Sequence, residues 1–185
     1  EAMSYDVFWN EKLTGKVGHF DWHLPSLGQL SLKDGNASPS PFDIDEAKWE
    51  KLQETTLSLK PQVGGYFDYG GTFASLKNGE MYAMCGIGDW ITGVLLKDGA
   101  PVDSVIPEQG GIQWTESYSI GKGTEKAEIV NKFIQYMLSP KGQVRSIQMA
   151  AYPGLSPTKS GWKAIQEANP DEAKRSGLIE GADND

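Results

Sequence analysis

The chain has 185 residues, the size of one domain or slightly more, and its 38% hydrophobic and 23% charged residues are typical of a globular protein. Its formal net charge of −8 is spread along the chain, which argues against binding to nucleic acid or to an anionic membrane surface. No apolar run approaches the length of a membrane-spanning helix, so the composition excludes an integral membrane protein of the helical type.

The first predicted elements are a short strand and a helix separated by a polar, aromatic loop. Residues 16–20 are predicted to form the strand, and Asp21, Trp22 and His23 follow it as the loop. A helix is expected over residues 25–32, because a proline stands in what would be its first turn.

The clearest early helix is predicted over residues 43–59, where apolar residues recur near helical spacing and Asp43 or Asp45 can cap its start. Glycine pairs on either side of residues 66–69 predict that these aromatic residues form a loop. Four further elements are expected: a helix over 72–78, a buried strand over 81–86, a helix over 89–96 and a strand over 102–106.

The last part of the chain is predicted to contain one more strand, over residues 114–120, and then only helices. Residues 125–138 place five large apolar side chains on one helical face, and two more helices are expected over 140–150 and 159–168. Helices that alternate with short buried strands indicate an α/β fold with a largely parallel sheet flanked by helices.

Trp114 and Glu116 are the first candidates for a binding site. Residues i and i+2 of a strand point to the same face, so the predicted strand presents an aromatic ring beside a carboxylate. This pair suits a ligand with an ammonium group, through ring-face attraction and a charge-assisted hydrogen bond. The alternative is a half-buried edge strand, with the tryptophan in the core and the glutamate in solvent.

Ligands of parallel α/β sheets bind outside the carboxyl ends of the strands, which selects four loops for closer inspection. All four carry aromatic residues, and three carry carboxylates. The candidate ligand-binding residues in these loops are Asp21, Trp22, His23, Asp89, Trp90, Trp114, Glu116 and Tyr152.

A metal site is an alternative reading of one of these loops. His19, Asp21 and His23 would lie on one face if the strand continued through all three, and imidazoles with a carboxylate can bind zinc or iron. The strand is expected to end before His23, and no fourth ligand of nitrogen or sulfur type stands out. His23 is therefore expected to hydrogen-bond a ligand rather than a metal.

Motifs of common enzyme classes are absent from the sequence, including the nucleophile elbow, the zinc-protease motif and the phosphate-binding loops. Cys85, the one cysteine, excludes an intrachain disulfide and lies in an apolar stretch where a thiol is normally inert. We therefore expect a binding protein without a cofactor, and not an enzyme.

Five segments resemble one family, in the same order along the chain. They are Val-Ile-Pro-Glu-Gln-Gly-Gly-Ile-Gln-Trp at 105–114, Leu-Thr-Gly-Lys-Val at 13–17, Lys-Asn-Gly-Glu-Met at 77–81, the helix and proline of 124–140, and the Tyr-Pro and Ser-Pro pairs at 152–157. Together they resemble bacterial spermidine/putrescine-binding proteins, the periplasmic substrate-binding subunits of ABC importers.

The resemblance implies a type II periplasmic binding protein fold, in which two lobes close around a small solute and present it to an ABC permease in the membrane. It implies that residues 1–113 form the second lobe, 114–120 a hinge strand, 121–158 part of the first lobe, and 159–185 a return to the second lobe. The expected location is periplasmic, or extracytoplasmic and lipid- or membrane-associated in a Gram-positive host.

The resemblance also assigns site residues. Trp114 matches the family's hinge tryptophan, Glu116 its hinge aspartate, and Tyr152 the tyrosine of its Tyr-Pro loop. Trp22 and Pro25 stand where the family has acids, which leaves less negative charge for a long polyamine. The implied solute is a small amine-containing molecule: polyamine-like, an amino-acid derivative or an opine-like conjugate.

The resemblance further implies that the sheet of the first lobe lies outside this chain. The apolar face of the helix predicted over 125–138 would then have no sheet to cover and would form an exposed patch. A separate fragment supplying the first lobe is therefore an expected partner. The alternative is that this helix packs on the second lobe or exchanges into a neighbouring molecule.

Overall fold

The computed structural model describes residues 4–113, 115–149, 154 and 156–177. The chain divides into two compact units, Glu1–Trp114 and Thr115–Asp185, and each is described by itself. Among the described residues, no helix is long and apolar enough to cross a membrane.

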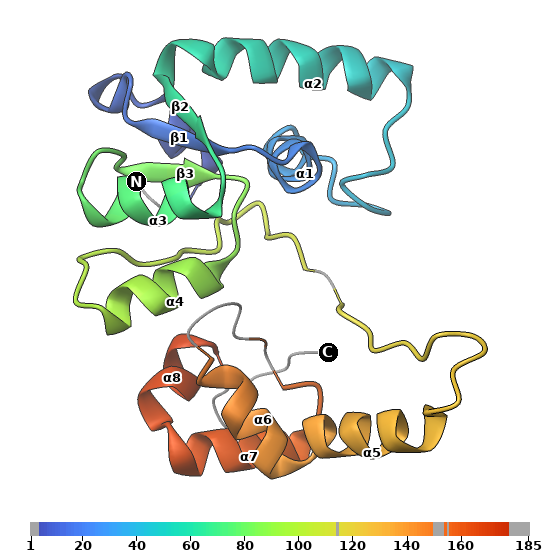
Figure 1. The fold of residues 1–185 in the computed structure, drawn as a ribbon. Helices are drawn as coiled ribbons and strands as arrows, with labels where there is room; N and C mark the ends of the chain where they lie inside the picture. Colours follow the sequence, from blue (N-terminus) through green and yellow to red (C-terminus); the bar gives the residue numbers. More distant parts are fainter. Residues whose placement is uncertain (1–3, 114, 150–153, 155, 178–185) are drawn as a thin grey trace. The chain divides into compact units, whose positions relative to one another are not determined.

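The first unit is built on a parallel sheet, which confirms the predicted fold class. Within the described residues the sheet has three strands in the order β2-β1-β3: β1 is Val17–Phe20, β2 is Val63–Phe67 and β3 is Ala83–Cys85 (Figure 1). Phe20 pairs with Phe67 at the carboxyl ends of β1 and β2, so these two strands end side by side.

Helices cover both faces of this sheet. They are the short 3₁₀ helices η1 (Tyr5–Trp9), η2 (Glu11–Leu13) and η3 (Lys60–Gln62), and the α-helices α1 (His23–Lys33), α2 (Glu46–Leu59), α3 (Tyr69–Lys77) and α4 (Asp89–Lys97). α2 lies on one side of the sheet, and α3 and α4 lie on the other (Figure 1). Asp45 rather than Asp43 caps α2, because its Oδ1 accepts a hydrogen bond of 2.9 Å from the amide of Lys48.

The predicted loop over 66–69 is wrong, because β2 runs through Phe67 and α3 begins at Tyr69. One of the glycines that suggested a loop, Gly64, instead allows close backbone packing. A Cβ on Gly64 would lie 2.2 Å from the carbonyl oxygen of Gly15, so glycine is required in the strand here. Asp68 is the residue between strand and helix, and it caps α3.

Two other predicted strands are absent from the described residues. Residues 102–106 form no strand, since Pro101 and Pro107 flank them and Ile106 is 75% exposed. Residues 115–120 form no strand either, and all six are exposed. Alternating patterns predict a strand only where one face can be buried, and within the described residues neither segment joins the sheet.

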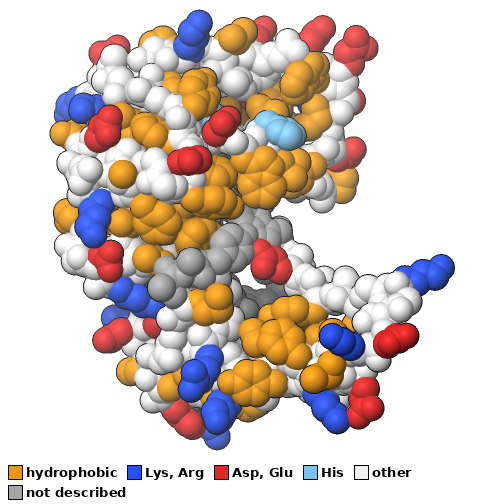
Figure 2. Space-filling view, in the orientation of Figure 1, with side chains coloured by type: hydrophobic (Ala, Val, Ile, Leu, Met, Phe, Trp, Pro, Cys, Tyr) orange, Lys and Arg blue, Asp and Glu red, His pale blue; other side chains and the backbone are white. Residues whose placement is uncertain are grey.

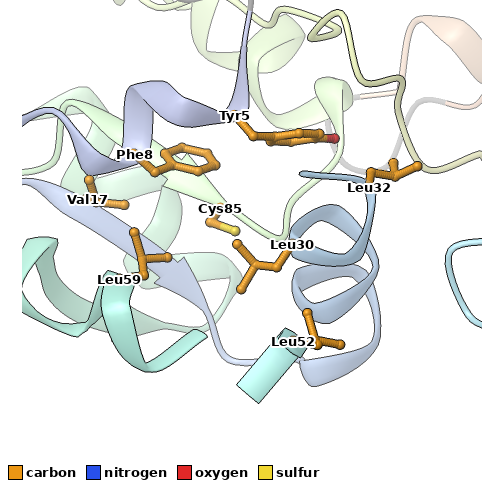
Figure 3. Packing of buried hydrophobic residues seen from close by; sticks show 8 residues of the cluster. All are labelled: Tyr5, Phe8, Val17, Leu30, Leu32, Leu52, Leu59 and Cys85. Carbon is orange, nitrogen blue, oxygen red and sulfur yellow. The ribbon is translucent and has the colours of Figure 1, made fainter. Parts of the chain in front are cut away.

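The main hydrophobic core lies between η1, α1, α2 and one face of the sheet. Its buried members are Tyr5, Phe8, Val17, Leu30, Leu32, Leu52, Leu59 and Cys85 (Figure 3). Phe20 belongs to the opposite face of β1, where its ring centroid lies 4.8 Å from that of Tyr69 in α3. The alternation of β1 therefore joins a core on one side to an aromatic cluster on the other.

The second unit is helical in its described part, with α5 (Ala127–Leu138), α6 (Pro140–Ile147), α7 (Lys159–Ala168) and α8 (Pro170–Arg175). Ile147, Ile165 and Ala173 form its buried cluster, one from each of the last three helices. The sequence predicted α5, α6 and α7 but missed α8. The family resemblance assigned residues 159–185 to the same lobe as residues 1–113. In the structure α7 and α8 pack with α6, in the second unit. The division into lobes remains a prediction.

α5 has an exposed apolar face. None of its twelve residues is buried, and Ile129 and Phe133 are 63% and 55% exposed, whereas Ile134 and Met137 are half-buried. Tyr118 packs edge-on against Phe133, with ring centroids 6.5 Å apart. Apolar side chains reach the surface where α5 lies in Figure 1, between charged groups of both signs (Figure 2).

Candidate ligand-binding site

A pocket of about 290 Å³ lies at the carboxyl ends of β1 and β2, within the first unit. It is lined by Phe20, Asp21, Trp22, Asp68 and Tyr69. This is the edge of a parallel sheet at which ligands bind, and Asp21 and Trp22 of the first loop chosen from the sequence are among the lining residues; their role in binding remains a prediction.

The two carboxylates of the pocket are brought together by strand pairing. Phe20 pairs with Phe67, and the amide of the next residue, Asp21, donates a hydrogen bond of 2.8 Å to the carbonyl of Phe67. Asp21 and Asp68 therefore follow adjacent strands, whose backbones are about 4.8 Å apart in a parallel sheet. Both side chains are exposed and line the pocket, so its lining includes two acidic residues.

Asp68 also has a structural role, because it begins α3. Its Oδ1 accepts a hydrogen bond of 2.8 Å from the amide of Gly71, which satisfies one of the first amides of the helix. Sequence reasoning missed Asp68 as a site residue because it placed the residue inside a loop. An aspartate before a run of small residues is a cap signal that could have identified the strand-to-helix junction.

Aromatic rings form the rest of the pocket wall. Trp22 and Tyr69 are 41% and 42% exposed, so both present ring surface to a ligand. Tyr69 is held from behind by Phe20 and by Trp90, whose ring centroid lies 5.7 Å from that of Tyr69. Trp90 is only 9% exposed and also contacts Phe73, so we expect it to position Tyr69 rather than to touch a solute.

His23 and Asp89 are not among the residues that line the pocket. His23 is the first residue of α1 and follows Trp22, and Asp89 is the first residue of α4. Both side chains are exposed at helix starts, next to residues of the aromatic cluster. Their role in binding remains a prediction.

The arrangement expected for a metal site is not present. β1 ends at Phe20 and His23 begins a helix, so His19, Asp21 and His23 do not share a strand face. Within the part of the chain that the structure describes, no three His, Cys, Asp or Glu residues are grouped to hold a metal ion. Burial lowers the pKa of His19, although a contact of its Nδ1 with the carbonyl of Phe20 at 3.0 Å opposes the shift.

Trp114 and Tyr152 lie outside the described residues. Glu116 is described, in the second unit, and is exposed. Because residues 115–120 form no strand, the same-face argument for Trp114 and Glu116 loses its geometric basis. The pair remains a prediction that depends on the resemblance alone.

A second pocket, of about 270 Å³, lies between α1 and α2 and has a different character. Its lining residues are Leu27, Trp49, Gln53, Thr56 and Leu57, none of which is charged. A cation would lose its hydration there without a compensating carboxylate. The two pockets therefore differ in chemistry, and only the one at the sheet edge suits an amine.

Comparison with known proteins places this chain in a family. Residues 1–171 match the model of the bacterial extracellular solute-binding proteins. Over 156 residues the chain is 25% identical to spermidine/putrescine-binding periplasmic protein 1 of Haemophilus influenzae, covering 83% of this chain and 41% of that protein.

A solved structure shows the same fold. The substrate-binding protein of a spermidine/putrescine ABC transporter from Streptococcus pneumoniae, in complex with calcium and HEPES, superposes with a TM-score of 0.69 at 17% identity. The match covers 94% of this chain and 50% of that one, so the chain spans about half the length of the relatives it matches. These relatives are named as binding proteins, not enzymes. The chain belongs to the bacterial extracellular solute-binding protein family and has the α/β fold of its periplasmic binding proteins.

Proposed function

We propose that this chain belongs to the solute-binding component of an ABC importer and that its solute carries an ammonium group. The observation that carries the proposal is the pocket at the sheet edge, where Asp21 and Asp68 stand beside the exposed rings of Trp22 and Tyr69. None of the five lining residues is basic, so nothing in the lining neutralises the two carboxylates. A cationic ligand does so, and the rings attract its charge.

The class of solute follows from the number and placement of the acids. Trp22 and Pro25 stand where the resemblance expects acids, and Pro25 is buried in α1 and is not among the lining residues of the pocket. Asp68 supplies a second carboxylate from the neighbouring strand. We therefore favour a compact amine-containing solute: a small polyamine, an amino-acid derivative or an opine-like conjugate. The relatives named for spermidine and putrescine support an amine.

The finer transport steps are proposed on the same basis. The first lobe would close over the solute held by the second lobe, and the closed form would be presented to a permease on the periplasmic or outer face of the membrane. Trp114, Glu116 and Tyr152 are the residues we expect to contribute from the hinge and the second unit. The exposed face of α5 supports an additional polypeptide that supplies the remainder of the first lobe.

A ligand screen on the 185-residue chain tests the proposed function. Amide NMR spectra would be recorded with putrescine, spermidine, amino acids and a sugar–amino-acid conjugate, with 1,4-butanediol as the uncharged control for putrescine. We expect amines, and not the diol, to shift the signals of Asp21, Trp22 and Tyr69. Shifts produced equally by the diol, or by anions alone, would contradict an amine solute.

A further inference from the structure

We infer that Gln29 of α1 is a positioning residue for the candidate site. It is not among the lining residues of the pocket, but it fixes the loop between β3 and α4, and this loop supports both exposed rings of the lining. The inference rests on the proposed function for what the pocket binds. It deepens that function by naming a residue on which the shape of the site depends, and Gln29 was not among the residues that the sequence analysis selected.

The side-chain oxygen of Gln29 accepts two hydrogen bonds from the end of β3. The amide of Gly86 donates to it at 2.7 Å, and the thiol of Cys85 donates at 3.5 Å. Burial raises the pKa of this thiol to about 12, so Cys85 keeps the proton that it donates. The atom that faces two donors must be the oxygen of the side-chain amide, because the nitrogen donates and does not accept.

The loop that Gln29 holds lies directly against α1. Gly86 is the first residue after β3 and has a φ of 86°, a conformation that residues other than glycine rarely adopt. A Cβ on Gly86 would lie 2.0 Å from Oγ of Ser26. Ser26 and Gln29 are three residues apart in α1 and therefore lie on the same face of the helix. This face holds the loop by close packing at Ser26 and by hydrogen bonding at Gln29.

Ser26 connects the loop to the first of the two rings, Trp22. Ser26 is 0% exposed, and its Oγ donates a hydrogen bond of 3.0 Å to the carbonyl of Trp22. If Gly86 moved away from α1, space would open beside this hydroxyl and it would be free to rotate away from Trp22. The position of the loop therefore constrains the backbone that carries the tryptophan ring.

α4 connects the same loop to the second ring, Tyr69. α4 begins at Asp89, three residues after Gly86, and Trp90 is its second residue. The ring centroid of Trp90 lies 5.7 Å from that of Tyr69. A shift of the loop would move the start of α4 and, with it, the ring that supports Tyr69. Through this one loop, Gln29 acts on both exposed rings of the pocket.

Two substitutions at Gln29 and one control test the inference in ligand-free protein. Gln29→Leu removes the acceptor at similar size, Gln29→Glu keeps an oxygen acceptor, and Gln53→Leu changes a glutamine of α2 that lines the other pocket. Gln29→Leu should speed hydrogen exchange of the Gly86 amide by about tenfold or more and should move the side-chain NMR signals of Trp22 and Tyr69. Gln29→Glu and Gln53→Leu should leave the exchange rate and both signals close to those of the parent protein.

Titration with putrescine measures the consequence for binding. Gln29→Leu should weaken binding by about fivefold or more, because rings that are no longer held in place must be ordered when the solute binds. Gln29→Glu should bind like the parent protein. The amide signals of β2 show whether each variant is folded. If Gln29→Leu does not fold, Gln29→Asn repeats the comparison, since it keeps a polar amide but withdraws the oxygen by one methylene group.

The outcomes separate this inference from the proposed function. Parent-like exchange and ring signals in Gln29→Leu would overturn the inference, and so would a Gln29→Glu variant that behaves like Gln29→Leu. Unchanged putrescine affinity in a variant whose rings have moved would also overturn it. If no amine shifts the pocket signals of the parent protein, the proposed amine solute fails, while the ligand-free measurements still decide whether Gln29 positions the rings.

Discussion

Replacement of Gly64 by alanine should destabilise the first unit, because the added methyl has no room. The nearest atoms to the new Cβ would be the carbonyl oxygen of Gly15 at 2.2 Å, its carbonyl carbon at 2.8 Å and Cε of Met81 at 2.8 Å. Two of these belong to the backbone, so relief requires β2 and the turn at Gly15 to move apart. Overpacking of this kind costs about 1–3 kcal/mol. Alanine also lowers the conformational entropy of the unfolded chain, which offsets only about 0.4–1 kcal/mol of that cost. The net expected loss is about 1.3 kcal/mol, from the middle of both ranges.

Gly70→Ala is the matched control with the opposite expected sign. Gly70 lies in the first turn of α3, where the only atom near a new Cβ is Oδ1 of Asp68 at an ordinary 3.7 Å. Alanine favours the helix, so this variant should gain about 0.5 kcal/mol. Urea unfolding, followed through the amide signals of β1 and β2, measures both changes in the first unit. A Gly64→Ala midpoint at or above that of Gly70→Ala would refute the close backbone approach.

Two further predictions concern Cys85 and the hinge residues. Burial raises the pKa of the Cys85 thiol to about 12, against 9.0 in the unfolded chain, so the thiol ionises only on unfolding. The free energy of unfolding should therefore fall as pH rises above about 9, by up to about 1.4 kcal/mol per pH unit. The fall should be less steep in Cys85→Ala. Equal dependence of the unfolding free energy on pH in the two proteins, measured by urea titration, would contradict this. Trp114→Ala and Glu116→Gln should each weaken amine binding by about 2 kcal/mol, measured by calorimetric titration. Unchanged affinity in both variants would show that these residues have a structural role and do not bind the ligand.

The helices of this chain could be predicted from its sequence because their signals are local. α7 begins and ends at the residues predicted for it, and α2 begins directly after one of the two aspartates predicted to cap it. α8 was missed because it is six residues long and too short to show a period. Local signals fix a helix when both its cap and its periodicity are present, and they fail when only one is.

The strands were harder to predict because burial and pairing decide them. β2 contains two glycines, which in isolation favour a turn, and only the approach of Gly15 and Met81 shows why Gly64 is there. Residues 102–106 have the composition of a strand without a neighbour to pair with. Strand propensity reflects a half-buried surface, so a sequence without its partners gives an incomplete prediction.

The site was predicted in part, and the missing part has the same cause. Asp21 and Trp22 were found because they directly follow a strand, whereas Asp68 lies far along the chain and reaches them only through the pairing of Phe20 with Phe67. Trp90 was taken as a contact residue, but an aromatic residue at a helix start can equally turn into the cluster behind the pocket. Distinguishing these two roles requires burial, which sequence spacing does not provide.

The presence of both Asp21 and Asp68 in the pocket lining changes how the charge of the candidate site should be counted. Acids counted along the first loop alone give one carboxylate, because Trp22 and Pro25 occupy the expected acidic positions. Counted across the sheet edge, the pocket has two, since strand register brings the end of β2 beside the end of β1. An acidic residue absent from the loop after one strand can therefore be replaced by an acidic residue after the neighbouring strand, and the same edge of the sheet still carries two carboxylates. Under the proposed function, substitution at Trp22 would change the aromatic contact with the solute, while the charge available to bind a cation would depend on residues that adjacent strands bring together.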